Sequence, residues 1–134
     1  MFYKKKNREK LSKTYMTQSM EDYLEMVSFL ADTGPVRVTD IAKRLGFSKP
    51  SVLFALKLLE ERGLVSHERY STVELTAKGA ELAAEIRGRH TVIKQFLVQH
   101  LNIDPAIAEV DACKMEHVLS AETLQSMRRL CGVE

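Results

Sequence analysis

Several residue types that help to classify a protein are scarce in this chain. It contains no tryptophan, three prolines and two cysteines in 134 residues. Cys113 and Cys131 match neither the spacing of a zinc finger nor a disulfide framework, which favours a reducing compartment. No apolar run approaches the roughly 18 residues of a membrane span, and no apolar segment follows the basic start, as a secretion signal would require. We therefore expect a cytoplasmic protein that does not enter a membrane.

The chain also has little excess of either charge, because its 20 lysines and arginines and 18 acids give a formal net charge of only +2. Its distribution is uneven, since residues 1–13 carry lysines and arginines at six positions against Glu9 alone. Such a segment is either a solvated tail or an arm that contacts DNA phosphates. The rest of the chain shows no internal repeat and no low-complexity linker.

Residues 38–62 have the pattern of two short helices separated by a glycine-containing turn. Gly46 closes the first helix, and Pro50 suits the first turn of the second, where its missing N–H costs nothing. Two β-like segments around a polar turn follow, and Val73 and Leu75 alternate with polar residues as in a half-buried strand. Two helices and a β wing in this order predict a winged helix-turn-helix, a DNA-binding fold.

Double-stranded DNA is the partner expected for such a fold. Its second helix enters the major groove, and its wing lies along the backbone or the minor groove. Ordinary surface charge is the alternative reading of the basic residues. The residues expected to face DNA lie in the second helix and its cap, before the first helix, and in the wing: Ser48, Lys49, Pro50, Ser51, Phe54, Lys57, Arg37, His67 and Arg69.

A stretch near the C-terminal end carries a thiol, a carboxylate and an imidazole, which together bind transition metals. Positions 113, 116 and 117 share one face of a helix that we expect over residues 105–119. Asp22 and Glu25 lie three residues apart on a helix expected to begin near Ser19. His90 interrupts an apolar stripe on a long helix expected over residues 76–100.

Each of these residues has an ordinary alternative, such as helix N-terminal acids that face water or a hydrogen-bonded core histidine. Chance rarely produces all six on three helices. Their oxygen-rich mixture suits Mn²⁺ or Fe²⁺ better than a structural zinc site, although one thiolate favours Fe²⁺, Co²⁺ or Zn²⁺. We expect Mn²⁺ or Fe²⁺ as the cofactor, with Co²⁺, Zn²⁺ or Ni²⁺ able to bind in vitro, and no organic cofactor. The predicted ligands are Asp22, Glu25, His90, Cys113, Glu116 and His117.

The C-terminal half carries more apolar residues than a small three-helix unit is expected to bury. Asp104 and Ser120 are expected to cap its last two helices. A homodimer core is the natural place for the excess apolar surface. The residues that prompt this expectation are Ile93, Phe96, Val110, Val118 and Leu124.

Three stretches resemble the metal-dependent repressors typified by the diphtheria toxin repressor and the manganese transport regulator. They are SMEDYLE at residues 19–25, RH at residues 89–90 and DACKMEHVLS at residues 111–120. The resemblance extends from residue 19 to about residue 131. It implies a mostly α-helical protein in which a winged helix-turn-helix precedes a helical dimerisation and metal-binding domain. It also implies metal-activated repression of metal-uptake genes.

The resemblance to the family is divided between its two branches. Asp22 and Glu25 match the manganese branch, whereas Cys113 matches the iron branch. Lys94 stands where the ancillary site of the iron branch needs a carboxylate, which argues against that site here. A binuclear centre of the manganese type, with Cys113 in place of one oxygen ligand, remains open.

These observations divide the chain into a basic tail (1–18), a winged helix-turn-helix (19–76) and a helical metal-binding and dimerisation half (77–134). A regulator of the same fold that responds to a different ligand is the main alternative. A metal-dependent enzyme is the other, but the sequence shows no nucleophile motif and no glycine-rich phosphate loop. We therefore expect a regulator and not an enzyme.

Overall fold

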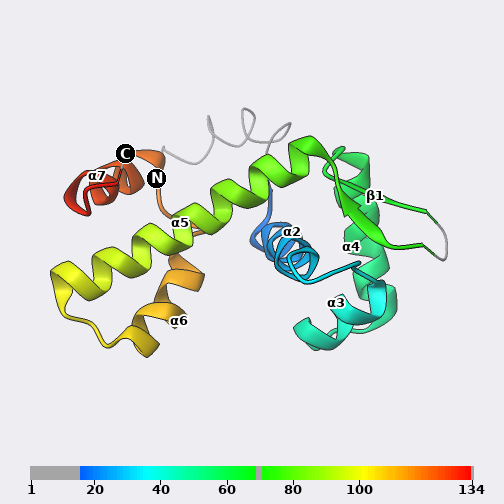
Figure 1. The fold of residues 1–134 in the computed structure, drawn as a ribbon, viewed down its shortest axis with the longest axis horizontal. Coiled ribbons are helices and arrows are strands. Elements are labelled where there is room, and N and C mark those ends of the chain that lie inside the picture. Colours follow the sequence, from blue (N-terminus) through cyan, green and yellow to red (C-terminus); the bar gives the residue numbers. More distant parts are fainter. Residues whose placement is uncertain (1–15, 69–70, 134) are drawn as a thin grey trace, which may run out of the picture.

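The computed structural model describes residues 16–68 and 71–133, which form a mostly helical protein with a small sheet (Figure 1). Its helices are α2 (Gln18–Ala31), α3 (Val38–Leu45), α4 (Lys49–Glu61), α5 (Ala77–Leu101), α6 (Pro105–Met115) and α7 (Ala121–Leu130). Strands β1 (Val65–His67) and β2 (Val73–Leu75) pair antiparallel between α4 and α5. The predicted winged helix-turn-helix followed by a helical half is confirmed. None of the described helices has the length and apolarity needed to cross a membrane.

Local capping explains where most helices begin. The side chains of Thr17, Ser48, Thr76, Asp104 and Ser120 each accept a hydrogen bond from a backbone N–H in the first turn of α2, α4, α5, α6 and α7. The predicted caps of the last two helices are confirmed. In contrast, α2 begins one residue before Ser19, because its cap is Thr17.

The end of α6 differs from the prediction. The helix stops at Met115, four residues before the expected end at Leu119. Glu116 is its C-cap and keeps a right-handed helical conformation (φ −58°, ψ −24°), and His117 follows in a turn. Because the chain leaves the helix without a left-handed residue, the side chains of Cys113, Glu116 and His117 still point to one region.

Two clusters of buried side chains are joined by α5, which crosses the molecule from the wing to α6 and α7 (Figure 1). The first cluster packs α2, α3, α4 and the wing against the start of α5, and includes Leu24, Ile41, Leu56 and Ile86. The second packs the rest of α5 against α6 and α7, and includes Ile93, Leu97, Ala112 and Leu124. One continuous helix therefore belongs to both cores.

The apolar residues predicted to need a dimer core fall into two groups. Ile93 and Leu124 are buried within the chain itself, and Phe96 packs against them while partly buried, so the helices of one chain already cover these side chains wholly or in part. Val110 and Val118 are instead 54% and 73% exposed. The second core is thus larger than the sequence suggested, and the remaining apolar surface is smaller.

Candidate metal centre

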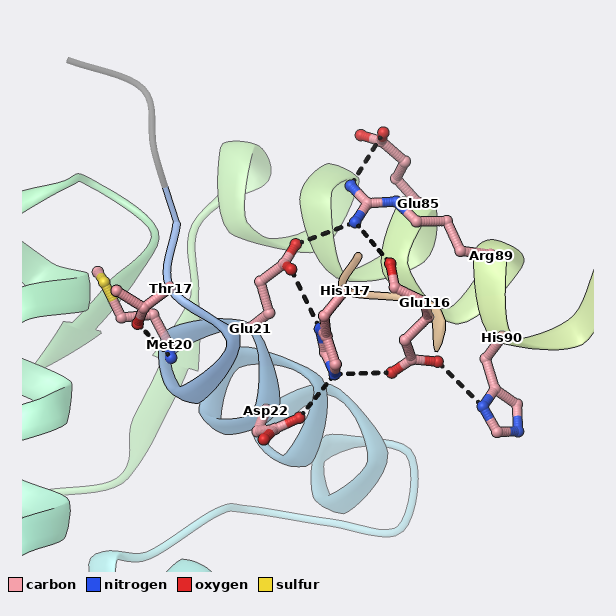
Figure 2. A network of polar contacts seen from close by, with 9 residues as sticks. All are labelled: Thr17, Met20, Glu21, Asp22, Glu85, Arg89, His90, Glu116 and His117. Carbon is pink, nitrogen blue, oxygen red and sulfur yellow. Dashed lines mark hydrogen bonds and ion pairs between the residues drawn. The ribbon is translucent and has the colours of Figure 1, made fainter. Parts of the chain in front are cut away.

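Three parts of the fold bring the predicted ligands together, and Figure 2 shows Asp22, His90, Glu116 and His117 among them. The first turns of α2 lie beside α5 and beside the turn that follows α6, so residues far apart in the chain become neighbours. Helix α2 packs in the first cluster of buried side chains, which belongs to the DNA-binding half, whereas α6 packs in the second cluster. Helix α2 carries Asp22 and Glu25, and α5 carries His90. Helix α6 and the turn after it carry Cys113, Glu116 and His117.

Two sets of donor atoms lie close enough to hold a cation. His90, Cys113 and Glu116 form one set, and Asp22, Glu116 and His117 form the other; within each set the donor atoms lie within 4.8 Å of one another. Glu116 belongs to both sets because its two carboxylate oxygens face different partners. Its Oε2 lies 2.9 Å from His90 Nδ1, and its Oε1 lies 3.3 Å from His117 Nε2 (Figure 2). The geometry is that of two adjacent positions that share one carboxylate.

Glu25 lies outside both sets but against their shared member. The carboxyl groups of Glu25 and Glu116 lie close enough to affect each other's pKa. Burial, followed by repulsion from Glu25, raises the pKa of Glu116 to about 8. Burial also raises the pKa of Glu25. The centre is therefore a cluster of acids whose negative charge is costly unless a cation or protons offset it.

Two buried polar atoms of the centre have no hydrogen-bond partner among the described residues. They are Glu116 Oε1 and His117 Nε2. His117 Nε2 lies only 2.9 Å from Asp22 Oδ1, but the contact is not aligned as a hydrogen bond. Buried polar atoms are nearly always paired. An unpaired oxygen and an unpaired nitrogen 3.3 Å apart, in one donor set with Asp22, fit a divalent cation bound between them.

Cys113 contributes the one sulfur of the predicted ligand set and lies at its exposed edge. Desolvation, followed by the negative charges of Glu116 and Glu25, raises the pKa of the Cys113 thiol. A thiol binds a metal as the thiolate, so coordination here would release a proton. The sulfur therefore adds a soft donor to a centre otherwise made of oxygen and nitrogen.

The sequence did not reveal two acids that contact the histidines. Glu21 is buried, and its carboxylate lies 3.1 Å from both His117 Nδ1 and Arg89 Nη1. Glu109 is half-exposed, and its Oε1 lies 2.9 Å from His90 Nε2. Glu21 is 96 residues from its histidine and Glu109 is 19 from its own. The spacing of residues along a single helix cannot predict either of these contacts between an acid and a histidine.

Comparisons with known proteins account for almost the whole described chain. Residues 15–73 match the iron dependent repressor N-terminal DNA binding domain, and residues 76–133 match the iron dependent repressor metal binding and dimerisation domain. The chain belongs to the iron-dependent repressor family. It is thus a metal-dependent DNA-binding regulator, and not an enzyme, as the sequence motifs predicted.

Relatives of this repressor occur in bacteria and archaea. It is 42% identical over 110 residues to the transcriptional regulator MntR of Escherichia coli, a match that covers 81% of this chain and 70% of that protein. It is 40% identical over 115 residues to an uncharacterized HTH-type transcriptional regulator of Methanocaldococcus jannaschii, covering 84% and 92% of the two chains.

Solved structures of the family share the fold. A manganese-dependent transcriptional repressor in complex with manganese gives a TM-score of 0.78 at 26% identity, covering 86% of this chain and 53% of that one. The structure of ScaR with bound Zn²⁺ gives 0.76 at 26% identity, covering 86% and 54%. The chain spans about half the length of these solved structures.

Most of the residues predicted to face DNA lie on or beside α4, before α3 and in the described part of the wing. Arg37, Lys49 and His67 line one hollow together with Leu53. His67 is half-buried, and its backbone N–H donates a hydrogen bond of 3.1 Å to Glu60 Oε2, which links the wing to α4. The remaining exposed members of the predicted set are Ser48, Pro50, Ser51, Phe54 and Lys57.

The Ser48 hydroxyl is already used as the cap of α4, where it accepts a hydrogen bond of 3.3 Å from the Ser51 backbone. Arg69 and the basic segment 1–13 lie outside the described residues. Phe54 is 66% exposed and is the most exposed apolar side chain of α4.

Proposed function

We propose that this repressor is activated by Mn²⁺ or Fe²⁺, binds operator DNA as a homodimer in the cytoplasm, and controls genes for metal uptake. The observation that carries the proposal is the position of Glu116, which is shared by two donor sets. One of those sets includes Asp22 from the DNA-binding core, and the other includes His90 and Cys113 from the opposite half. The predicted ligands thus extend across the junction between the two halves.

The mechanism follows from that junction. A bound divalent cation would supply the positive charge that offsets the crowded carboxylates of Asp22, Glu25 and Glu116. Asp22 and Glu25 belong to α2, which packs in the same core as the recognition helix α4. Holding them against Glu116 and His117 fixes the orientation of α4 relative to the dimerisation half. In a dimer this sets the two recognition helices near one DNA turn apart, about 34–36 Å, by selecting one conformer of an existing ensemble.

The choice between Mn²⁺ and Fe²⁺ is a competition between donor types. Asp22, Glu25 and Glu116 provide the oxygen atoms that Mn²⁺ prefers, whereas the Cys113 sulfur favours Fe²⁺, Co²⁺ and Zn²⁺. One structural neighbour is a complex with manganese and another has bound Zn²⁺. Both are consistent with a centre that admits several divalent cations and is selective through their availability.

Fluorescence anisotropy of labelled promoter DNA tests the proposal. Chelator-treated wild-type protein is titrated at fixed salt with Mn²⁺, Fe²⁺ under anaerobic conditions, Co²⁺ or Zn²⁺. We expect at least a ten-fold rise in DNA affinity with the activating metal, a coupling of about 1.4 kcal/mol. Glu116→Ala is expected to remain a folded dimer whose weak DNA binding does not respond to metal.

A matched control is Glu122→Ala, which removes an acid from the first turn of α7, away from the centre. It should respond to metal like the wild type. Flat titrations of the wild type with every metal, or full metal stimulation of Glu116→Ala, would contradict the proposed function. The rank order of the four metals would show which donor type dominates.

A further inference from the structure

Helix α4, the second helix of the helix-turn-helix, presents two large apolar side chains to solvent. Leu53 is 46% exposed and Phe54 is 66% exposed, although the helix buries four other apolar residues in the first core. We propose that Leu53 and Phe54 determine operator specificity by contacting the C5-methyl groups of thymine bases in the major groove. The inference rests on the proposed function, because it names the chemical feature of the operator that this surface recognises.

The composition of α4 leaves it few side chains that could recognise a base by hydrogen bonds. Its sequence, KPSVLFALKLLEE, contains no arginine, asparagine or glutamine, the residues that most often form bidentate hydrogen bonds with guanine or adenine. Ser51 Oγ already accepts a hydrogen bond of 2.9 Å from Ser48 Oγ. Glu60 and Glu61 stand at the C-terminal end, whereas the N-terminal residues of such a helix contact the bases. Besides its two lysines, α4 is therefore left with apolar contact as its means of recognising a base.

The two lysines stand on either side of the apolar pair along the exposed face of α4. Lys49 lies one turn before Leu53 and Lys57 lies one turn after it, at spacings that share a helix face. Both lysines are exposed. In a DNA groove, phosphates border the base edges, and lysines bind phosphates. An apolar pair between two cations therefore fits DNA better than it fits an apolar protein surface.

Both apolar side chains border open space on the DNA-binding half. Leu53 lines a hollow between α4 and the wing that Arg37 and His67 also line. Phe54 lines a second hollow on the other side of α4, together with Pro50 one turn before it. A base edge that carries a methyl group can occupy either space, with cationic side chains beside the first.

Replacement of thymine by uracil in the promoter DNA tests the contact directly, because it removes the methyl group and leaves the hydrogen-bonding edge unchanged. Fluorescence anisotropy of the full chain with its activating metal compares the two duplexes at fixed salt. We expect the wild type to bind the uracil duplex at least ten-fold more weakly. Equal affinity for the two duplexes would overturn the inference.

Replacement of one thymine at a time locates the methyl groups that are contacted. Each contacted methyl group is expected to contribute about a three- to five-fold change in affinity, the effect of returning one methyl group to water. In a homodimer the sensitive positions should form two groups about 10 base pairs apart. Small losses spread evenly over all thymines would contradict a contact by two side chains of α4.

Variants identify the side chains that contact the methyl groups. Phe54→Ala and Leu53→Ala should each lower the affinity ratio between thymine and uracil DNA, and the double variant should bring it to one. Lys57→Ala should instead weaken both duplexes equally and reduce the salt dependence by about one ion, because a phosphate contact carries no sequence information. A wild-type ratio in the double variant would overturn the inference, since uracil would then act through the stiffness of the DNA or through other residues.

The chain offers a matched control for the loss of an exposed ring. Phe29→Ala removes a 42% exposed phenylalanine of α2 that packs on Arg87 of α5, and it should keep the wild-type ratio. Metal-stimulated binding that is equal for thymine and uracil DNA would reject only this inference and leave the proposed function standing. Binding to neither duplex with any metal would contradict the proposed function, and the inference with it.

Discussion

Cys113 is the residue at which this centre differs most from a pure oxygen and nitrogen site. It lies at the exposed edge of α6, whereas its neighbour Glu116 is fully buried. A thiolate forms its strongest bonds with softer metals, so this side chain affects Co²⁺, Zn²⁺ and Fe²⁺ more than Mn²⁺. The second cysteine, Cys131, packs against the core of α5, α6 and α7 and belongs to neither donor set.

Replacement of the sulfur should therefore change selectivity rather than the fold. With Co²⁺, the wild type is expected to show a near-ultraviolet sulfur-to-cobalt charge-transfer band that Cys113→Ser lacks and Cys131→Ser retains. Cys113→Ser should lose at least ten-fold in Co²⁺ and Zn²⁺ affinity and much less in Mn²⁺ affinity. Absorption spectroscopy and metal competition titrations measure both effects. A full band in Cys113→Ser would place this thiol outside the metal coordination sphere.

The limits of sequence reasoning are also clearest among single residues. The ligands on α2 and at the end of α6 could be proposed because i, i+3 and i+4 spacing is a local property of a helix. Glu21 and Glu109 could not, because their roles depend on partners brought close only by the packing of α2 and α6 against α5. Nothing in the chain around either acid distinguishes it from an ordinary solvent-facing residue.

Among the elements, α5 depends on a close contact at its first turn. Gly79 packs against the backbone where the wing begins, and a Cβ at this position would lie 1.8 Å from the Leu64 carbonyl oxygen. The same carbonyl accepts a hydrogen bond of 3.1 Å from the Thr76 N–H, which fixes its direction. Only glycine lets helix and wing approach this closely, so the junction cannot relax by a side-chain movement.

Two glycine substitutions on this one helix should have opposite effects. Gly79→Ala is expected to lower the free energy of unfolding by about 1–3 kcal/mol or more, because the added methyl group overpacks a backbone contact. Gly88→Ala, whose Cβ would meet nothing within 4 Å, should raise it by up to about 1 kcal/mol through helix propensity. Urea unfolding of metal-free protein at one concentration compares the two. Equal effects would contradict the close contact at Gly79.

The helix boundaries show which structural signals are local. Capping side chains at Ser48, Asp104 and Ser120 act within one turn, and the sequence located these starts correctly. The end of α6 has no glycine or proline, so its stop at Met115 could not be read from the chain. The C-cap that follows is Glu116, a buried acid that no local sequence rule marks as a helix end.

At the scale of the whole molecule, the second core leaves part of its apolar surface uncovered. Side chains of α6, the turn after it and α7 remain more than half exposed although they are large and apolar: Ile107, Val110, Val118 and Leu130. This half matches the family's metal binding and dimerisation domain. The surface is therefore suited to contact a second copy of the chain.

A charge placed on this surface should weaken the dimer. Val110→Lys is expected to raise the dimer dissociation constant by at least ten-fold, because burying an unpaired ammonium group against a partner is costly. Leu53→Lys is the matched control, since Leu53 is similarly exposed but lies on α4 in the DNA-binding half. Sedimentation equilibrium measures both variants. A wild-type dissociation constant for Val110→Lys would move the dimer contact away from this part of α6.

The uneven burial of the predicted ligands also has a consequence for the speed of regulation. The side chains of Glu116 and His117 are 0% and 1% exposed and form the buried side of the centre. Asp22 is 42% exposed, and the exposed Cys113 lies with it on the solvent side, the open rim of the centre. An ion would enter and leave past the rim without the opening of either core. Gene control should then follow a fall in free metal within the lifetime of the bound ion, rather than wait for new protein to be made.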